Sequence, residues 1–250
     1  MGVKSAERVL EIFELLKDYP SGLTAKEIGN CLDYAGSSTF GLVKTLLDKG
    51  YLLEDSNKRY TLGAKLIQLG EYASAYLDIN KVAEPILNRL MQSVSETVFM
   101  AVLSDQEIIY TEIIDCFRSI STNARLGGKK PLYCTGLGKA FLSFLPEQES
   151  EALIEGMEFV AYTPNTISNP GELKAKISEF RKQGYAIDNE EIEVGLYCFA
   201  APVYGPQGRM EAAISVSGPT ARMKMNQENI IRELLETSKE ISEKMGYDGK

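Results

Sequence analysis

Few side chains in this sequence could do chemistry, and the most informative observation is an absence. The 250 residues include no histidine, and the four cysteines are Cys31, Cys116, Cys134 and Cys198. Without an imidazole there can be no His-based catalytic triad and no zinc site of the Cys/His or His/Glu type. The cysteines are too dispersed for a C-x-x-C pair and too few for a disulfide scaffold. We expect reduced thiols, no metal site and no cofactor.

Enzymatic activity is therefore not expected. A cysteine nucleophile would lack an imidazole base, and the sequence has no phosphate-binding loop, metal cluster or serine elbow. A Cys/Lys or Cys/Asp site stays open as an alternative, but no motif supports it. We predict no catalytic residues.

Three segments are nevertheless unusual for a plain core. The first, residues 133–140, is a small-residue turn that leads into a helix expected over about 138–145. Free backbone N–H groups at a helix start attract carboxylates, and glycine lets a ligand approach closely. The Gly-x-Gly in this turn lacks the third glycine of a dinucleotide fingerprint. The segment is either an anion site or a tight turn with a capped helix.

The second and third segments place polar groups on short apolar strands. Asp188 ends one strand, where its carboxylate could accept hydrogen bonds from ligand hydroxyls, and an acidic run typical of a solvated loop follows it. Cys198 lies on the next strand, where core packing is the default for a lone cysteine. Ser215 and Ser217 share one face of a third strand, because strand side chains alternate. Two hydroxyls on a buried face either bond within the core or line a polar pocket.

The first 62 residues have the pattern of a winged helix-turn-helix. Helical spacing covers residues 5–17, and a capping box of Thr24 and Glu27 opens a second helix that ends near residue 32. Ser37 or Ser38 is expected to cap a third helix over about 37–49, and residues 51–62 read as two short strands. Such an arrangement holds the third helix for entry into a major groove. A plain helical domain is the alternative.

The distribution of charge is compatible with DNA binding. The chain has a net charge of −8. Residues 1–62 carry eight Lys and Arg against nine Asp and Glu, so this part contributes only −1. Lys58 and Arg59 lie at the expected wing tip, where they are placed for phosphate contact or simply form a solvated turn.

The remaining residues predict an α+β protein. Residues 63–77 read as a linker helix whose apolar face should pack on the partner's copy in a dimer, or else inside its own chain. Residues 78–250 alternate between helical and strand patterns, which predicts an antiparallel sheet flanked by helices. The expected helices are 79–94, 138–145, 147–155, 170–183 and 226–245, and the expected strands are 98–103, 108–114, 118–123, 185–188, 197–203 and 210–217.

The cellular location is also constrained. Charged residues interrupt every turn of the first twenty residues, unlike a signal peptide, and no apolar run is long enough to span a membrane. We therefore expect a cytoplasmic protein without a membrane partner.

Taken in order, these motifs resemble the IclR (isocitrate lyase regulator) family of transcription factors over essentially the whole chain. Each motif is weak alone, but together they are specific. They are SAERVL (5–10), LTAKEI (23–28), KTL (44–46), KGY (49–51), YTLG (60–63), KA (139–140), GYAIDNEE (184–191), CFAAPV (198–203) and AISVSGP (213–219).

The resemblance implies a fold, partners and a function. It implies a winged helix-turn-helix at 1–62 that binds operator DNA, a linker helix at 63–77, and a GAF-like domain at 78–250 that binds a small organic or sugar acid. Homodimers or tetramers regulating catabolic genes, with repression expected, would follow. The implied DNA contacts are Ser37, Ser38, Thr39, Phe40, Lys44, Lys58 and Arg59. The implied effector contacts are the backbone of Gly136 and Leu137 with Asp188, Cys198, Ser215 and Ser217.

One position departs from the family pattern. Gly41 stands near the middle of the reading helix, where the family usually carries a basic residue. Glycine costs a helix about 1 kcal/mol against alanine and offers no side-chain contact to DNA. The alternative function is therefore a small-molecule sensor with weakened or lost DNA binding that acts through protein contacts.

Overall fold

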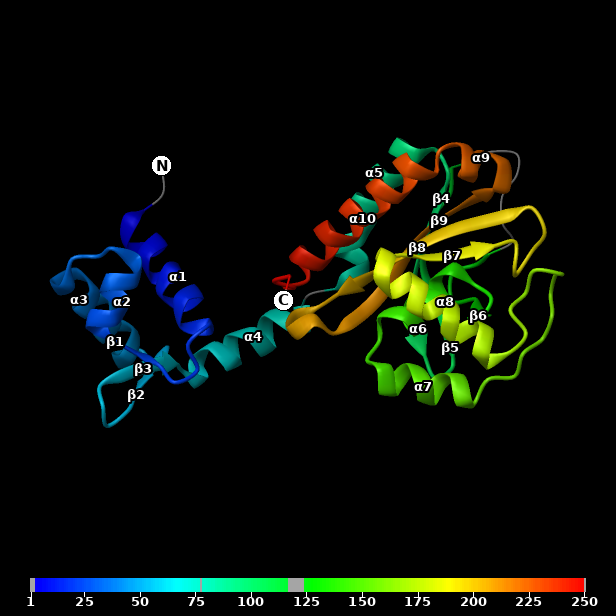
Figure 1. The fold of residues 1–250 in the computed structure, drawn as a ribbon. Coiled ribbons are helices and arrows are strands. Elements are labelled where there is room, and N and C mark those ends of the chain that lie inside the picture. Colours follow the sequence, from blue (N-terminus) through cyan, green and yellow to red (C-terminus); the bar gives the residue numbers. More distant parts are fainter. Residues whose placement is uncertain (1–2, 77, 117–123, 250) are drawn as a thin grey trace. The chain divides into compact units, whose positions relative to one another are not determined.

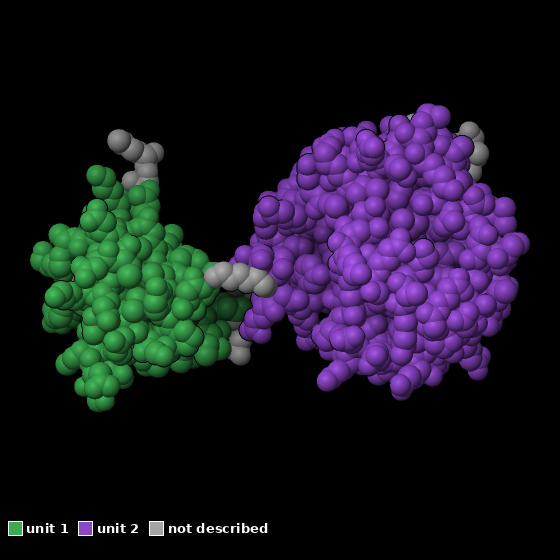
Figure 2. Space-filling view, in the orientation of Figure 1, with its two compact units in different colours: residues 1–77 green, residues 78–250 purple. Residues whose placement is uncertain are grey.

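The chain folds into two compact units. The computed structural model describes residues 3–76, 78–116 and 124–249. Met1–Leu77 form the first unit and Asp78–Lys250 the second, coloured separately in Figure 2. Among the described residues, no helix combines the length and apolar character that crossing a bilayer requires.

The smaller unit is a winged helix-turn-helix followed by a helix. Three helices enclose a core that includes Ile12, Ile28 and Val43, and the three strands pair in the order β1-β3-β2. Its elements are α1 (Lys4–Lys17), β1 (Leu23–Thr24), α2 (Ala25–Leu32), α3 (Gly36–Asp48), β2 (Leu52–Glu54), β3 (Arg59–Leu62) and α4 (Ala64–Tyr76) (Figure 1).

The capping signals in the sequence predicted the start of α2 correctly but not the start of α3. The capping box at α2 is confirmed, because the Thr24 side chain accepts from the Glu27 amide and Glu27 accepts from the Thr24 amide in return. The predicted caps of α3 are wrong, since Ala35 is the N-cap residue and makes no side-chain cap bond. Helix α3 therefore begins at Gly36, before both serines.

Helix α4 has apolar side chains that the rest of the smaller unit leaves exposed. Ile67, Leu69 and Tyr72 are 66%, 47% and 70% exposed. Packing of these three side chains inside the smaller unit is therefore not seen. The predicted dimer contact along this face stays a prediction.

The larger unit is built on one antiparallel sheet, so the α+β prediction is confirmed. Six strands pair in the order β6-β5-β4-β9-β8-β7. The strands are β4 (Thr97–Ser104), β5 (Glu107–Ile114), β6 (Lys129–Pro131), β7 (Ala186–Asn189), β8 (Leu196–Tyr204) and β9 (Met210–Pro219). The helices are α5 (Ile79–Val94), α6 (Gly136–Phe144), α7 (Glu147–Glu155), α8 (Pro170–Gln183), α9 (Thr220–Met225) and α10 (Gln227–Lys244), with a short 3-10 turn, η1, at Pro206–Gly208.

Several details differ from the sequence prediction, which also lacked β1 and α9. The strand predicted at 118–123 lies entirely outside the described residues, whereas β6 was not predicted. Helix α6 starts at Gly136, two residues before its predicted start at 138. This earlier start brings Gly136 and Leu137 into the first helical turn.

Alternation along the strands divides the core into two layers. On one face, α5 and α10 lie side by side over a cluster that includes Val98, Met100 and Ile214 (Figure 1). On the other face, α6 and α8 pack over Phe99 and Ala101 and their neighbours. Side chains that alternate with the first cluster along β7, β8 and β9 therefore face α6.

Two helical glycines offer a matched test of this fold. A Cβ at Gly41 would meet no atom within 4 Å, whereas a Cβ at Gly138 would lie 2.4 Å from the Cα of Leu132. Alanine costs a helix about 1 kcal/mol less than glycine. We expect Gly41→Ala to raise the hydrogen-exchange protection of the α3 amides in the full chain about fivefold. Gly138→Ala should instead lower the hydrogen-exchange protection of the larger unit, because the added Cβ would clash with Leu132. A change of protection in the same direction in both variants would contradict this packing.

Candidate functional site

A cavity of about 90 Å³ lies between the start of α6 and the sheet. All six residues that the sequence assigned to an effector line this cavity: Gly136, Leu137, Asp188, Cys198, Ser215 and Ser217. The structure thus brings together three segments that are far apart in the chain.

The floor of the cavity is a row of polar side chains that crosses three strands. Asp188 on β7 pairs with Cys198 on β8, and Cys198 pairs with Ser217 on β9. Ser215 pairs with Phe99 of β4 on its other side. Directly paired residues share a sheet face, so the carboxyl, thiol and hydroxyl groups lie next to one another facing α6.

The roof of the cavity is the first turn of α6. The Thr135 side chain caps this helix by accepting a 3.1 Å hydrogen bond from the amide of Gly138. Helix geometry leaves the amides of Gly136 and Leu137 without partners inside the helix. A Cβ on Gly136 would come within 3.3 Å of the Cβ of Cys198, so the missing side chain lets the turn lie close to the sheet. Backbone donors and the positive end of the helix dipole therefore face the polar row.

Asp188 is the buried acid of the cavity, only 1% exposed. Its Oδ1 accepts a 2.8 Å hydrogen bond from the amide of Glu191, and its Oδ2 lies 3.9 Å from the Cys198 thiol, which donates to it. Burial raises the pKa of Asp188 from 3.8 to about 7, although the Lys139 charge and the Glu191 amide oppose this shift. Asp188 therefore changes between acceptor and donor near neutral pH.

The neighbouring thiols are poor nucleophiles. Burial, with the charge of Asp188 second, raises the pKa of Cys198 well above 9.0 and that of Cys134 to about 12. Both thiols are therefore protonated at neutral pH, unlike reactive cysteines. Within the described residues, no group of three His, Cys, Asp or Glu side chains could hold a metal ion.

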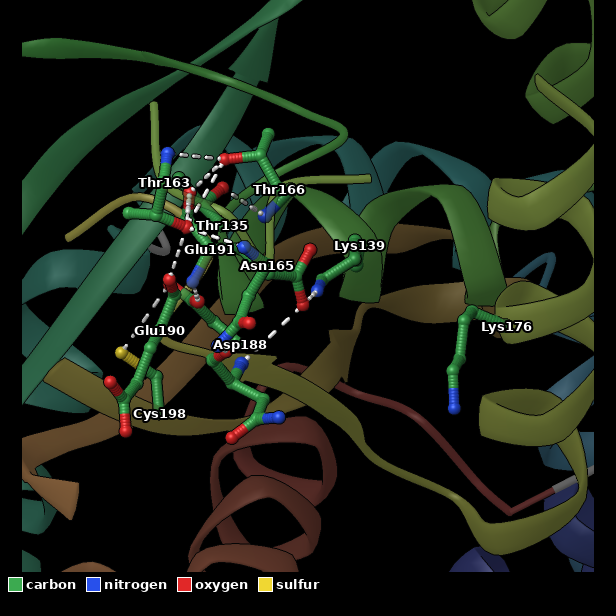
Figure 3. A network of polar contacts seen from close by, with 12 residues as sticks. Thr135, Lys139, Thr163, Asn165, Thr166, Lys176, Asp188, Glu190, Glu191 and Cys198 are labelled. Carbon is green, nitrogen blue, oxygen red and sulfur yellow. Dashed lines mark hydrogen bonds and ion pairs between the residues drawn. The ribbon is translucent and has the colours of Figure 1, made fainter. Parts of the chain in front are cut away.

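A buried ion pair stands behind the cavity. Lys139 on α6 is fully buried and donates to Oε1 of Glu191, itself 6% exposed, as Figure 3 shows. The sequence predicted a solvated loop for the acidic run after Asp188. Glu191 corrects this prediction, because its charge is compensated by an ammonium group 52 positions away in the chain.

Two threonines fix the backbone of the same loop. Thr163 Oγ1 donates to the carbonyl oxygen of Glu190, and Thr166 Oγ1 donates to that of Glu191, both at 2.6 Å (Figure 3). Asn165 reaches the carbonyl of Asn189 at 3.2 Å. The loop that carries Glu191 is thereby tied to residues 163–166, which the sequence did not indicate as part of the site.

Sequence reasoning missed the rest of the cavity wall. Lys130 and Glu193 place one charge of each sign in that wall. The other missed lining residues are Phe99, Tyr110, Ala124, Thr135, Ile192 and Leu196. Most are ordinary apolar or loop positions, which carry no signal in the sequence, so only the folded structure identifies them.

The second candidate surface is the solvent side of α3. Ser37, Phe40 and Lys44 are exposed there, and Phe40 is 56% exposed. Ser38 is half-buried, and its Oγ accepts a 3.1 Å hydrogen bond from Arg8. Ser37, Phe40 and Lys44 thus remain available for contact with DNA.

Two predicted DNA contacts need correction. Thr39 is fully buried and donates to the carbonyl of Ala35, because it lies on the inner side of α3 against α2. The Arg59 guanidinium donates to the carbonyl of Gly22 at 2.8 Å and pairs with Glu27, so it supports the fold rather than standing free at the wing tip. Lys58 is the wing residue that projects, with its side chain 77% exposed.

The raised pKa of Asp188 has a measurable consequence for stability. A folded-state pKa of about 7 lies above the ordinary 3.8, so the native chain holds a proton that the unfolded chain releases. This contribution is complete below pH 4 and is lost as the pH rises toward 7. In the absence of ligand, the free energy of unfolding of wild type minus that of Asp188→Asn should fall by about 3 kcal/mol from pH 5 to pH 8.

Chemical denaturation of the full chain at several pH values checks this prediction. Other titrating groups cancel when the two proteins are compared at each pH. Parallel pH profiles for wild type and Asp188→Asn would contradict a carboxyl group that is protonated in the native state.

Comparison with known proteins supports the family resemblance along the whole chain. The helix-turn-helix domain of IclR matches residues 5–56, and the C-terminal domain of bacterial IclR transcriptional regulators matches residues 72–243. The transcriptional regulator XynR of Escherichia coli K12 is 31% identical over 98% of both chains. The transcriptional repressor IclR of the same strain is 32% identical over 88% of this chain and 82% of its own. The crystal structure of the Thermotoga maritima IclR covers 98% of this chain and 99% of its own at 33% identity, with a TM-score of 0.66. This chain therefore belongs to the IclR family of bacterial transcriptional regulators.

Proposed function

We propose that this protein represses a catabolic operon, and that its affinity for operator DNA changes when a small organic or sugar acid binds the cavity under α6. One observation carries the proposal. Backbone donors from a helix start, two hydroxyls and a buried carboxyl converge on one cavity, and all six residues expected for an effector line it. The similarity to a transcriptional repressor supports the direction of regulation.

The cavity suits an acid with a hydroxyl or carbonyl group nearby. The amides of Gly136 and Leu137 and the hydroxyls of Ser215 and Ser217 would donate to the effector's carboxylate. Asp188 would accept from a hydroxyl or hydrate when ionised, or donate when protonated. With no imidazole in the chain, the cavity offers no histidine base, and its groups are proposed to bind the acid without turnover.

Effector binding is proposed to change the affinity for DNA through the oligomer. An effector that fits one arrangement of the paired chains better than another shifts the population toward it. The exposed apolar side chains of α4 are proposed to form the contact between two copies, and two such dimers would give a tetramer. The regulator would act in the cytoplasm, where its operator is.

In the smaller unit, Ser37, Phe40 and Lys44 on α3 and Lys58 on the wing are the proposed DNA contacts. Ser38 is retained only as a backbone-phosphate contact that would require its present partner, Arg8, to be exchanged. Direct base contact is expected mainly from α3, because a helix fits the major groove.

A specific observation keeps a second function open. Gly41 supplies no side chain and Thr39 is buried, so α3 presents fewer contacts than the sequence predicted. A sensor that acts through protein contacts would bind acids but select no operator.

The leading function predicts a salt-sensitive, sequence-specific complex with DNA upstream of the protein's own gene. Phosphate contacts make such a complex weaken as salt rises, whereas specificity shows as a defined footprint. Footprinting with and without a panel of short 2-oxo and sugar acids measures both. Acid binding with no specific footprint under any condition would favour the sensor.

The cavity assignment predicts separable variants. Ser215→Ala should weaken effector binding at least tenfold, since a hydrogen bond to a charged group contributes about 1.5–3 kcal/mol. Operator affinity without effector should not change. Ser143→Ala is the matched control, because Ser143 is equally buried on α6 but bonds to the carbonyl of Lys139 outside the cavity lining. Unchanged effector affinity in Ser215→Ala, measured by calorimetry, would refute the assignment.

A further inference from the structure

Phe40 is an exposed aromatic residue whose surroundings differ from those of an ordinary surface residue. It lies on the solvent side of α3, one turn before Lys44, while Thr39 and Val43 pack inward. A single exposed apolar side chain needs no explanation by itself. The groups around the ring are what indicate a ligand.

Phe40 lines a groove between α2, α3 and the wing, in which charged side chains come from all three elements. The charged residues are Lys26, Lys44 and Lys58, with Asp48 and Glu54 opposing them. Lys58 lies 3.6 Å from Glu54 but is 77% exposed, so this pair is weak. Among the described residues, Lys26 and Lys44 form no ion pair within 4 Å. Ammonium groups around an apolar ring match a polyanion that also presents an apolar group.

Gly41 lets another molecule come closer to the helix backbone beside the ring of Phe40. It follows Phe40 on the exposed side of α3, and a Cβ there would meet no atom within 4 Å. The helix therefore does not need this glycine for its own packing. A position without a side chain lets another molecule approach the helix backbone closely. A phenyl ring is shorter than an arginine or lysine side chain, and it needs that approach to touch a base edge.

We propose that Phe40 reads thymine by packing on its C5-methyl group in the major groove, with Gly41 allowing the close approach and Lys26, Lys44 and Lys58 contacting flanking phosphates. A phenyl ring can neither donate nor accept a conventional hydrogen bond. In the major groove of unmodified DNA, thymine alone presents a methyl group. The inference rests on the proposed DNA binding, and it assigns the base that this helix selects.

The test begins with selection from a library of random duplexes at fixed salt, using the full-length protein. Each thymine of the enriched sequence is then replaced singly by deoxyuridine, which removes only the methyl group. At one thymine of each half-site we expect wild-type affinity to fall about fourfold, as for the loss of one buried methyl. Phe40→Ala should bind the thymine and uracil duplexes equally.

Leu53→Ala is the matched control, since Leu53 is another exposed apolar residue of the same unit, at 55% exposure. It should keep the wild-type preference for thymine over uracil. Phe40→Leu should keep part of it, because leucine also packs on a methyl group. Thermal unfolding of each variant verifies that the smaller unit is intact.

The outcomes separate this inference from the proposed function. An enriched sequence at which Phe40→Ala retains the full preference for thymine overturns the role of Phe40 but leaves DNA binding in place. The role of Phe40 is also overturned if wild type binds every uracil duplex as tightly as the thymine duplex. That result would favour a protein partner for the exposed ring. If no sequence is enriched, the proposed DNA binding fails together with this assignment.

Discussion

The geometry of the larger unit depends on a buried ion pair between Lys139 and Glu191. Both groups have left water, so each charge is tolerable only beside the other, and loss of one partner typically costs about 3–5 kcal/mol. This requirement fixes the start of α6 against the loop after β7. Thr163 and Thr166 hold the same loop by its carbonyl groups. The pair therefore ties the helix that forms the roof to the loop that follows Asp188 on the floor.

The remaining features of the cavity come from the register of the strands and from burial. The cross-strand row of Asp188, Cys198 and Ser217 comes to lie under a helix start whose amides have no partners in the helix. Burial keeps the thiols protonated at neutral pH and raises the pKa of Asp188 to about 7. We propose that a site of this kind recognises an acid by hydrogen bonds from backbone amides, hydroxyls and one carboxyl group.

Sequence reasoning succeeded where the signal was local or where separate strands were each marked by a motif. The Thr24 and Glu27 cap lies within one turn, and Ser215 and Ser217 follow from strand alternation. It failed where a residue's partner lies far away in the chain. Glu191 pairs with Lys139, and Arg59 donates to the carbonyl of Gly22 and pairs with Glu27. Thr39 is buried because it packs against Gly29 of α2, a contact that the sequence pattern of α3 does not indicate. The family resemblance joined the cavity segments, but only the strand order explains why they meet.

The central claim is that an acid bound under α6 governs operator binding. Amide hydrogen exchange of the DNA-binding protein, with and without each acid that alters operator affinity, tests this most directly. We expect every such acid to slow exchange at Gly136 and Leu137, because their amides become donors to its carboxylate. An acid that changes operator affinity while leaving both amides unchanged would contradict it.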